Sequence, residues 1–201
     1  MPPAYPGMPL HSPPVTALSA LGVLALVLVA ALALVLVGSF NGLVRLRTRV
    51  DAAWAQIDVQ LQRRHDLIPN LVEAVKGYAA HERVVLEEVT AARSTAVGAQ
   101  GVDARGQAEQ QVSGALRSLL AVAEAYPDLE ADRSFLALQE ELEGTEGKIA
   151  YARQFYNDTV QRYDTRIQSF PGNVVAGLGH FEPRPYFQAD QASRGTVAVQ
   201  F

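Results

Sequence analysis

The segment QRRHDLIPNLVEAVKGYAAHE, residues 62–82, brings together side chains that could perform acid–base or metal chemistry. His81 and Glu82 begin like the H-E-x-x-H motif of zinc proteases, in which a second histidine follows one helical turn later, so that both imidazoles face one ion. Position 85 is valine, and His65 lies sixteen residues before His81. The spacing therefore predicts neither a zinc site nor any other histidine metal site.

Other catalytic patterns are also missing from the sequence. It has no Glu-x-x-His pair, no G-x-S-x-G and no phosphate-binding glycine loop, and its 201 residues include no cysteine. The absence of cysteine excludes disulfides, thiolate catalysis and cysteine-ligated metals. With 21 acidic and 17 basic residues the net charge is −4, so no basic footprint for nucleic acid exists. We expect a protein that is not an enzyme, needs no cofactor and binds no nucleic acid.

Two charged residues interrupt otherwise apolar helical stripes. Arg64 falls between Leu61 and Ile68, and Glu82 falls where the next apolar residue after Tyr78 is due. Such groups either brace helices through ion pairs, which fix register at a cost in stability, or line a polar pocket for a ligand. We predict a structural polar network formed by Arg64, Glu82, Asp58, Asn70 and Asn157. Within it, we expect Arg64 to pair with the acidic turn at 128–132. A ligand pocket is the alternative.

The elements that carry these residues are helices, because apolar residues recur every three or four positions from residue 43 to residue 170. Glycines near residue 100 and Pro127 separate the stripes. If the chain also folds back at Pro69, it forms an antiparallel four-helix bundle, with helices near 41–66, 69–97, 104–126 and 129–169. Without those breaks it forms a long two-helix hairpin. We favour the bundle, which buries more of each stripe.

The N-terminal part of the chain has the composition of a membrane anchor. No charged residue precedes Arg45, and residues 1–16 form a proline-rich tail that we expect to be disordered. Residues 17–37 are almost entirely apolar and reach about 31 Å as a helix, which matches the hydrocarbon core of a bilayer. A cleaved signal peptide would begin with a positively charged region, which is missing here. We therefore predict a single transmembrane helix.

The orientation follows from three bases, Arg45, Arg47 and Arg49, which directly follow the span and have no counterpart before it. The positive-inside bias places such residues in the cytoplasm. The sequence predicts a single-pass protein of the cell membrane, with its N-terminus outside and its helical domain, residues 40–170, in the cytoplasm.

Residues 171–201 read as an irregular tail rich in aromatic residues, because Pro183 and Pro185 exclude a helix across them. Either the tail packs on the helices through its rings, or it contacts a partner or the lipid headgroups. The candidate contact residues are Phe181, Tyr186 and Phe187.

Four ordered blocks of this sequence resemble the LemA family: AWAQIDVQLQRRHDLIPNLVEAVKGYAAHE, LLAVAEAYPDL, LQEELEGTEGKIAYARQFYNDTVQRYDTRIQSFPGN and PRPYF. The resemblance covers about residues 40–190. It implies an N-terminal anchor and an all-helical domain like a four-helix bundle, and it brings no enzymatic activity, cofactor or catalytic residue. It also implies a connection with membrane proteases and envelope maintenance.

These observations predict a membrane-anchored scaffold or adaptor. Its long stripes of heptad-like spacing, typical of coiled coils, would present a cytoplasmic surface to other membrane or cytoplasmic proteins, and we expect a homo-oligomer. The alternative is a ligand-binding sensor or transporter accessory protein, with Arg64 or Glu82 lining a polar pocket in the bundle.

Overall fold

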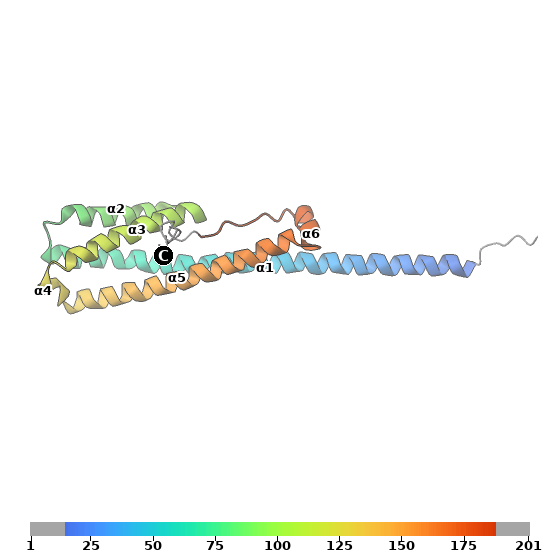
Figure 1. Ribbon diagram of the computed structural model, residues 1–201, viewed down its shortest axis with the longest axis horizontal. Helices are drawn as coiled ribbons and strands as arrows, with labels where there is room; N and C mark the ends of the chain where they lie inside the picture. Colours follow the sequence, from blue (N-terminus) through green and yellow to red (C-terminus); the bar gives the residue numbers. More distant parts are fainter. Residues whose placement is uncertain (1–14, 188–201) are drawn as a thin grey trace, which may run out of the picture.

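The computed structural model describes residues 15–187, with side chains from residue 20 onward, and this part of the chain is helical and contains no strand (Figure 1). The predicted proline-rich tail falls on residues 1–14, outside the described residues, whereas residues 15 and 16 already belong to the first helix. The helices are α1 Val15–Tyr78, α2 Arg83–Gly98, α3 Val102–Ala123, α4 Pro127–Glu130, α5 Arg133–Gln168 and α6 Gly172–Gly179.

Helix α1 is a single continuous helix of 64 residues, which at 1.5 Å per residue is about 96 Å long. Its N-terminal part, which contains the predicted span 17–37, stands free of the other helices (Figure 1). It is long and apolar enough to cross a membrane, and its most apolar window is not buried inside the protein. The predicted boundary near residue 40 is no break in the backbone, because α1 continues without a loop into the folded part.

The prediction that the chain folds back at Pro69 is wrong. Helix α1 passes through Pro69 and ends at Tyr78, and the corner lies at residues 79–82. A proline inside a helix has no N–H for the carbonyl four residues earlier, which here belongs to His65. That carbonyl instead accepts a hydrogen bond of 2.7 Å from Arg93 Nε on α2. The helix continues because a neighbouring helix supplies the missing donor.

The other corners lie close to where glycine and proline indicated them. Gly101 precedes α3 with φ of 82°, a conformation that glycine adopts easily. Pro127 occupies the first turn of α4, where its missing N–H is no loss. Asp132 caps α5 by accepting hydrogen bonds from the backbone N–H of Ser134 and Phe135, at 2.8 and 3.0 Å.

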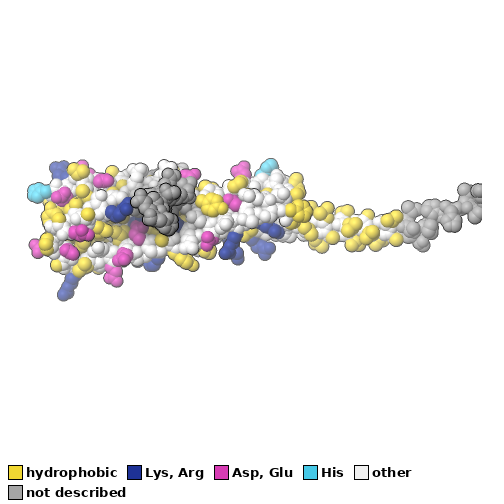
Figure 2. Space-filling view, viewed as in Figure 1, with side chains coloured by type: hydrophobic (Ala, Val, Ile, Leu, Met, Phe, Trp, Pro, Cys, Tyr) yellow, Lys and Arg dark blue, Asp and Glu magenta, His cyan; other side chains and the backbone are white. Residues whose placement is uncertain are grey.

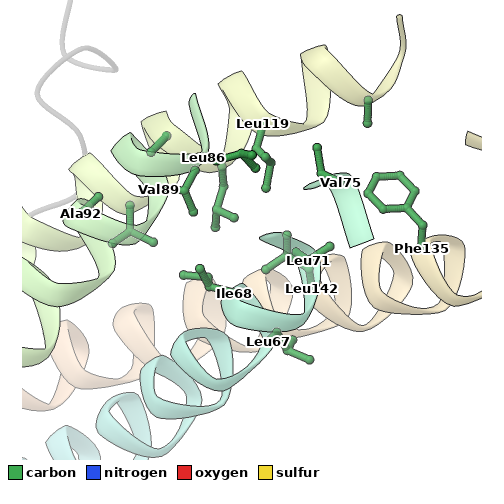
Figure 3. Close-up of a cluster of buried hydrophobic side chains, with 14 of the residues drawn as sticks. Leu67, Ile68, Leu71, Val75, Leu86, Val89, Ala92, Leu119, Phe135 and Leu142 are labelled. Atoms are coloured by element: carbon green, nitrogen blue, oxygen red, sulfur yellow. The ribbon is translucent and has the colours of Figure 1, made fainter. Parts of the chain in front are cut away.

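Two apolar clusters hold the helices together. Helix α5 runs along α1, α2 pairs with α3, and α2 also contacts α1 (Figure 1). The cluster far from the free part of α1 joins α1, α2, α3 and α5, and its side chains converge between these helices (Figure 3), among them Leu71, Val75, Leu86, Val89, Leu119, Phe135 and Leu142. The second cluster joins α1, α5, α6 and the segment after α6.

The prediction of an entirely irregular tail from residue 171 is wrong, because Gly172–Gly179 form helix α6. Residues 181–187 then run without helix or strand back along α1 and α5, as the prolines indicated (Figure 1). Residues 188–201 lie outside the described part of the chain, so the prediction for them is not addressed.

Candidate functional site

The most unusual feature of the interior is a buried arginine. Arg64 on α1 is only 2% exposed, and both of its terminal nitrogens are paired. Nη2 forms an ion pair with Glu109 on α3, and Nη1 contacts Glu146 Oε1 on α5 at 2.6 Å and Ser113 Oγ at 3.1 Å. Arg64 thus links three helices. The predicted pairing with the acidic turn at 128–132 is wrong, because α1 continues past Pro69 and places Arg64 farther from that turn.

Glu109 is shared between two neighbours on α1. Its Oε1 lies 2.9 Å from Nε2 of His65, a fully buried side chain, while its Oε2 contacts Arg64. Burial acts to raise the pKa of Glu109, but the contacts with His65 and Arg64 outweigh burial and hold this pKa below its ordinary value. Glu109 is therefore ionised at neutral pH and balances the charge of Arg64.

A pocket of about 400 Å³ lies beside this ion cluster and opens to solvent on one side. Its wall combines the polar side chains of Arg64, Glu109, Ser113 and Glu146 with leucines from three helices. Arg64 Nε is buried and makes no hydrogen bond within the described residues. A small molecule with a polar group and an apolar body would match this lining. Across the described part of the chain, no group of three acidic or histidine side chains could hold a metal ion.

The five residues predicted to form one polar network lie at separate places. Asp58 is exposed and pairs with Arg105 at 3.2 Å, whereas Asn70 is exposed on α1. Glu82 is half-buried at the corner before α2, where Tyr126 Oη donates to its Oε1 at 3.5 Å. Since Glu82 precedes α2, it does not occupy the apolar stripe that sequence spacing assigned to it.

Asn157 holds the segment that follows α6 instead of joining Arg64. Its Nδ2 donates to the Phe187 carbonyl at 3.0 Å, and its Oδ1 accepts from the Phe187 N–H at 2.9 Å. Two tyrosines of α5, one residue before and six residues after Asn157, also donate to backbone carbonyls of this segment. Tyr156 Oη donates to the Pro185 carbonyl at 2.8 Å, and Tyr163 Oη donates to that of Glu182 at 3.0 Å. Burial raises the pKa of Tyr156 to about 12, so its hydroxyl keeps its proton.

The three candidate contact aromatics divide into two groups. Phe181 and Phe187 are buried, Phe181 against Phe40 at 5.5 Å between ring centroids and Phe187 against Trp54 at 5.7 Å. Tyr186 is exposed. The rings of Phe181 and Phe187 therefore pack on α1 within this protein.

Sequence reasoning missed Glu109 and Glu146 as partners of Arg64, and His65 as the second neighbour of Glu109. A signal for Glu109 was present, because it lies three positions before Val112 and so falls on the apolar stripe of α3. An acid on one stripe and a base on another predict a buried pair if both helices share a core. Glu146 gave no such signal, since it lies at the edge of its stripe and is partly exposed.

The outer side of the α1–α5 pair carries an apolar groove. Val59 on α1 and Tyr151 and Phe155 on α5 are exposed, Tyr151 by 72%. Gly144 and Gly147 also line the groove on α5, and because they have no side chain they leave space there beside Val59 and Tyr151. The groove lies on the folded part of the chain, away from the free part of α1.

Over residues 15–187 these features define a helical protein without strands, whose N-terminal helix is long and apolar enough to cross a membrane. The LemA family model matches residues 53–201, and the chain belongs to the LemA family. The resemblance found in the sequence is thereby confirmed.

Similar proteins come from bacteria of different kinds. The chain is 26% identical over 205 residues to magnetosome protein MamQ 2 of Paramagnetospirillum magneticum, covering 89% of this chain and 74% of that protein. It is 24% identical to magnetosome protein MamQ of Magnetospirillum gryphiswaldense over the same shares of the two chains. It is 26% identical to protein LemA of Metamycoplasma hominis, covering 80% of this chain and 74% of that protein.

Proposed function

We propose that this protein is a non-enzymatic scaffold or adaptor that α1 anchors in the cell membrane. In this proposal α1, α2, α3 and α5 act as one antiparallel four-helix bundle in the cytoplasm and present their surface to protein partners. The observation that carries the proposal is the continuity of α1. The same helix is bare and apolar at one end and part of a packed core at the other.

An uninterrupted helix makes a stiff connection between membrane and bundle. From residue 38 to Tyr78, α1 extends about 60 Å at 1.5 Å per residue. A loop at this boundary would let the bundle swing, whereas a helix packed against α5 fixes its direction relative to the span. Such a spacer suits a protein that displays a surface at a set distance from the bilayer.

The surface proposed to meet partners is the α1–α5 groove lined by Val59 and Tyr151, together with the exposed Phe155 one turn farther along α5. Large apolar side chains gathered on an outer face are typical of protein interaction sites. In this proposal the partner is a membrane or cytoplasmic protein, or a second copy of the chain. A connection with envelope maintenance or membrane proteolysis, or with the assembly that the MamQ relatives are named for, belongs to this proposal as well.

Photo-crosslinking in intact membranes tests the proposal. A photoreactive amino acid at position 151 should give discrete crosslinked products that mass spectrometry identifies, and the same label at Ser118, exposed on α3, a helix that does not line the groove, should not. Products that contain only this chain would identify self-association. Equal, diffuse labelling from both positions would count against a partner surface on the groove.

A ligand sensor or transporter accessory protein is the second candidate function, and the pocket beside Arg64 favours it. We infer that its ligand would be small, with a polar group for the Arg64 cluster and an apolar part for the leucines. Native mass spectrometry of the full chain purified from its own cells would reveal such a molecule as a discrete added mass. Ser113→Leu, which fills the pocket beside Arg64, should remove that mass. The unmodified mass alone in both preparations would argue against this function.

A further inference from the structure

Helix α6 is held in place by unusually close contacts at both ends. At its start, a Cβ on Gly172 would lie 2.1 Å from the carbonyl oxygen of Arg166 on α5. At its end, a Cβ on Gly179 would lie 2.6 Å from the Phe181 ring and 3.3 Å from the Phe40 ring on α1. A side chain at Gly172 would collide with the backbone of α5, and one at Gly179 would displace the Phe181 ring, so α6 lies close against α5 and against the Phe40 ring of α1.

The inner and outer sides of α6 are both apolar. Val175 and Ala176 point inward and belong to the cluster shared with α1 and α5. On the outer side Val174 and Leu178 lie one helical turn apart, and Phe170 is exposed in the turn that precedes α6. Phe170 is 81% exposed and Leu178 is 75% exposed, and Val174 is also exposed. No Asp, Glu, Lys or Arg occurs from Ile167 to Phe181.

The position of α6 along α1 indicates what covers this outer side. Phe181 packs edge-on against Phe40, three residues beyond the predicted span, and Leu36 inside the span is partly buried against the same cluster. Ser39, between them, is buried although it lies at the end of the exposed apolar segment. Helix α6 therefore lies at the level where α1 would leave a bilayer.

The distribution of charged residues on α1 beside α6 agrees with a position of α6 at the bilayer boundary. Between Val37 and Arg45 no charged residue occurs, and Arg45, Arg47 and Arg49 then follow, all exposed. Figure 2 shows the apolar surface of the bare α1 continuing onto the adjoining end of the folded part, with basic side chains just beyond. Exposed apolar side chains at the headgroup boundary, with arginines of α1 on the water side of it, match the surroundings of a segment that lies at a membrane interface.

We propose that α6 is a second membrane contact, with Phe170, Val174 and Leu178 inserted at the boundary between headgroups and acyl chains. The proposal rests on the anchoring of α1 and goes beyond it. If a single helix crosses the bilayer, the folded part of the protein can still rotate about α1 and tilt relative to the membrane. An apolar helix packed beside α1 at the bilayer surface adds a second membrane contact. This contact determines which side of the folded part faces the bilayer.

Single-cysteine labelling of the full chain tests this contact, because the natural sequence has no cysteine to remove. We would introduce Leu178→Cys, Val27→Cys in the span, and Tyr151→Cys on the distant groove, which are all exposed positions. Each variant carries an environment-sensitive fluorophore and is reconstituted in two sets of phosphatidylcholine–phosphatidylglycerol vesicles, one with lipids spin-labelled near the top of the acyl chain to test position 178 and one with lipids spin-labelled near its end to test position 27. The label at 178 should be blue-shifted and lose most of its emission to the quencher, and the label at 151 should show neither change.

The three positions separate the two proposals. Quenching at 27 with none at 178 would overturn the α6 contact and leave the anchor intact. No quenching at 27 would overturn the anchor itself. A blue shift at 178 without quenching, present only when two copies share one lipid nanodisc, would assign the α6 face to a second copy and overturn the membrane contact.

Discussion

At the scale of single residues, Arg64 shows how a buried charge is accommodated. Its guanidinium is enclosed by three helices, and Glu109 supplies most of the compensation because it is buried as well. Removing one member of such a pair leaves the other charge buried without a partner, which costs about 3–5 kcal/mol. Pairs at the surface cost far less, because water takes the place of the lost partner.

We therefore expect Glu109→Gln to lower the free energy of unfolding by about 3 kcal/mol or more. Glu82→Gln is the matched control: Glu82 is half-buried, and its hydrogen bond with Tyr126 is long, so the change should stay within about 0.5 kcal/mol. Denaturant unfolding of the full chain in detergent, followed by the fluorescence of the single tryptophan Trp54, measures both. Equal effects of the two substitutions would contradict the assignment of Arg64 and Glu109 as a structural pair.

The pH dependence of this pair has a definite sign. The pKa of Glu109 in the folded protein lies below the ordinary value that it regains on unfolding. Its contribution to stability is therefore complete above about pH 4.5 and is lost as the pH falls through the lowered pKa. The difference in unfolding free energy between the natural chain and Glu109→Gln should be constant near neutrality and shrink in acid. A difference that grows as the pH falls would contradict this account.

At the scale of elements, Pro69 and Arg93 form an unexpected unit. The Arg93 side chain donates to the His65 carbonyl that Pro69 leaves free. Arg93→Met should destabilise the natural chain by about 1–3 kcal/mol, the cost of an unsatisfied buried acceptor. In a Pro69→Ala background the backbone N–H of residue 69 becomes available, so the same substitution should cost clearly less. Thermal or denaturant unfolding of the four proteins gives this coupling, and strictly additive effects would exclude it.

This unit also shows where sequence reasoning about the fold stops. Apolar spacing predicted the helices, because each must bury one side, and glycine and proline predicted the corners near residues 100 and 127. The corner at 79–82 was placed at Pro69, because the residue that compensates for the proline lies on another helix. The same holds at the site: Arg64 was identified from its stripe, but Glu109 and Glu146 depend on how helices face one another. Helix α6 was missed because eight residues are too few for a period.

The segment after α6 is the second element with a testable role. Lacking a neighbouring strand, residues 182–187 have their backbone groups satisfied by α5 side chains, including the paired hydrogen bonds of Asn157. Phe187→Ala removes a buried ring and should cost about 3–5 kcal/mol, whereas Tyr186→Ala, at an exposed neighbour, should cost little. Limited proteolysis of the natural chain and both variants would show whether only Phe187→Ala exposes this segment. Similar cleavage of both variants would contradict the packing.

At the scale of the whole molecule, the free part of α1 ends where helix α6 packs against it, and the three arginines follow just beyond that level. Within residues 20–187 the most apolar window of α1 is not buried by other helices, and it is long and apolar enough to cross a bilayer. The folded part beyond this level carries the ion cluster, the pocket and the groove. In the proposed anchored arrangement the cluster, the pocket and the groove all lie on one side of the membrane, and the direction of insertion decides which compartment they face.

The orientation is the last prediction. Arg45, Arg47 and Arg49 follow the span and no base precedes it, so the C-terminal side should be cytoplasmic. A reporter that is active only in the cytoplasm should work when fused after Phe201 and should fail when fused near Tyr5. Replacing the three arginines by glutamine removes the bias without adding a charge, and part of the population should then insert the other way. An active reporter near Tyr5 in the natural chain would reverse the assignment and place the groove and pocket outside the cell.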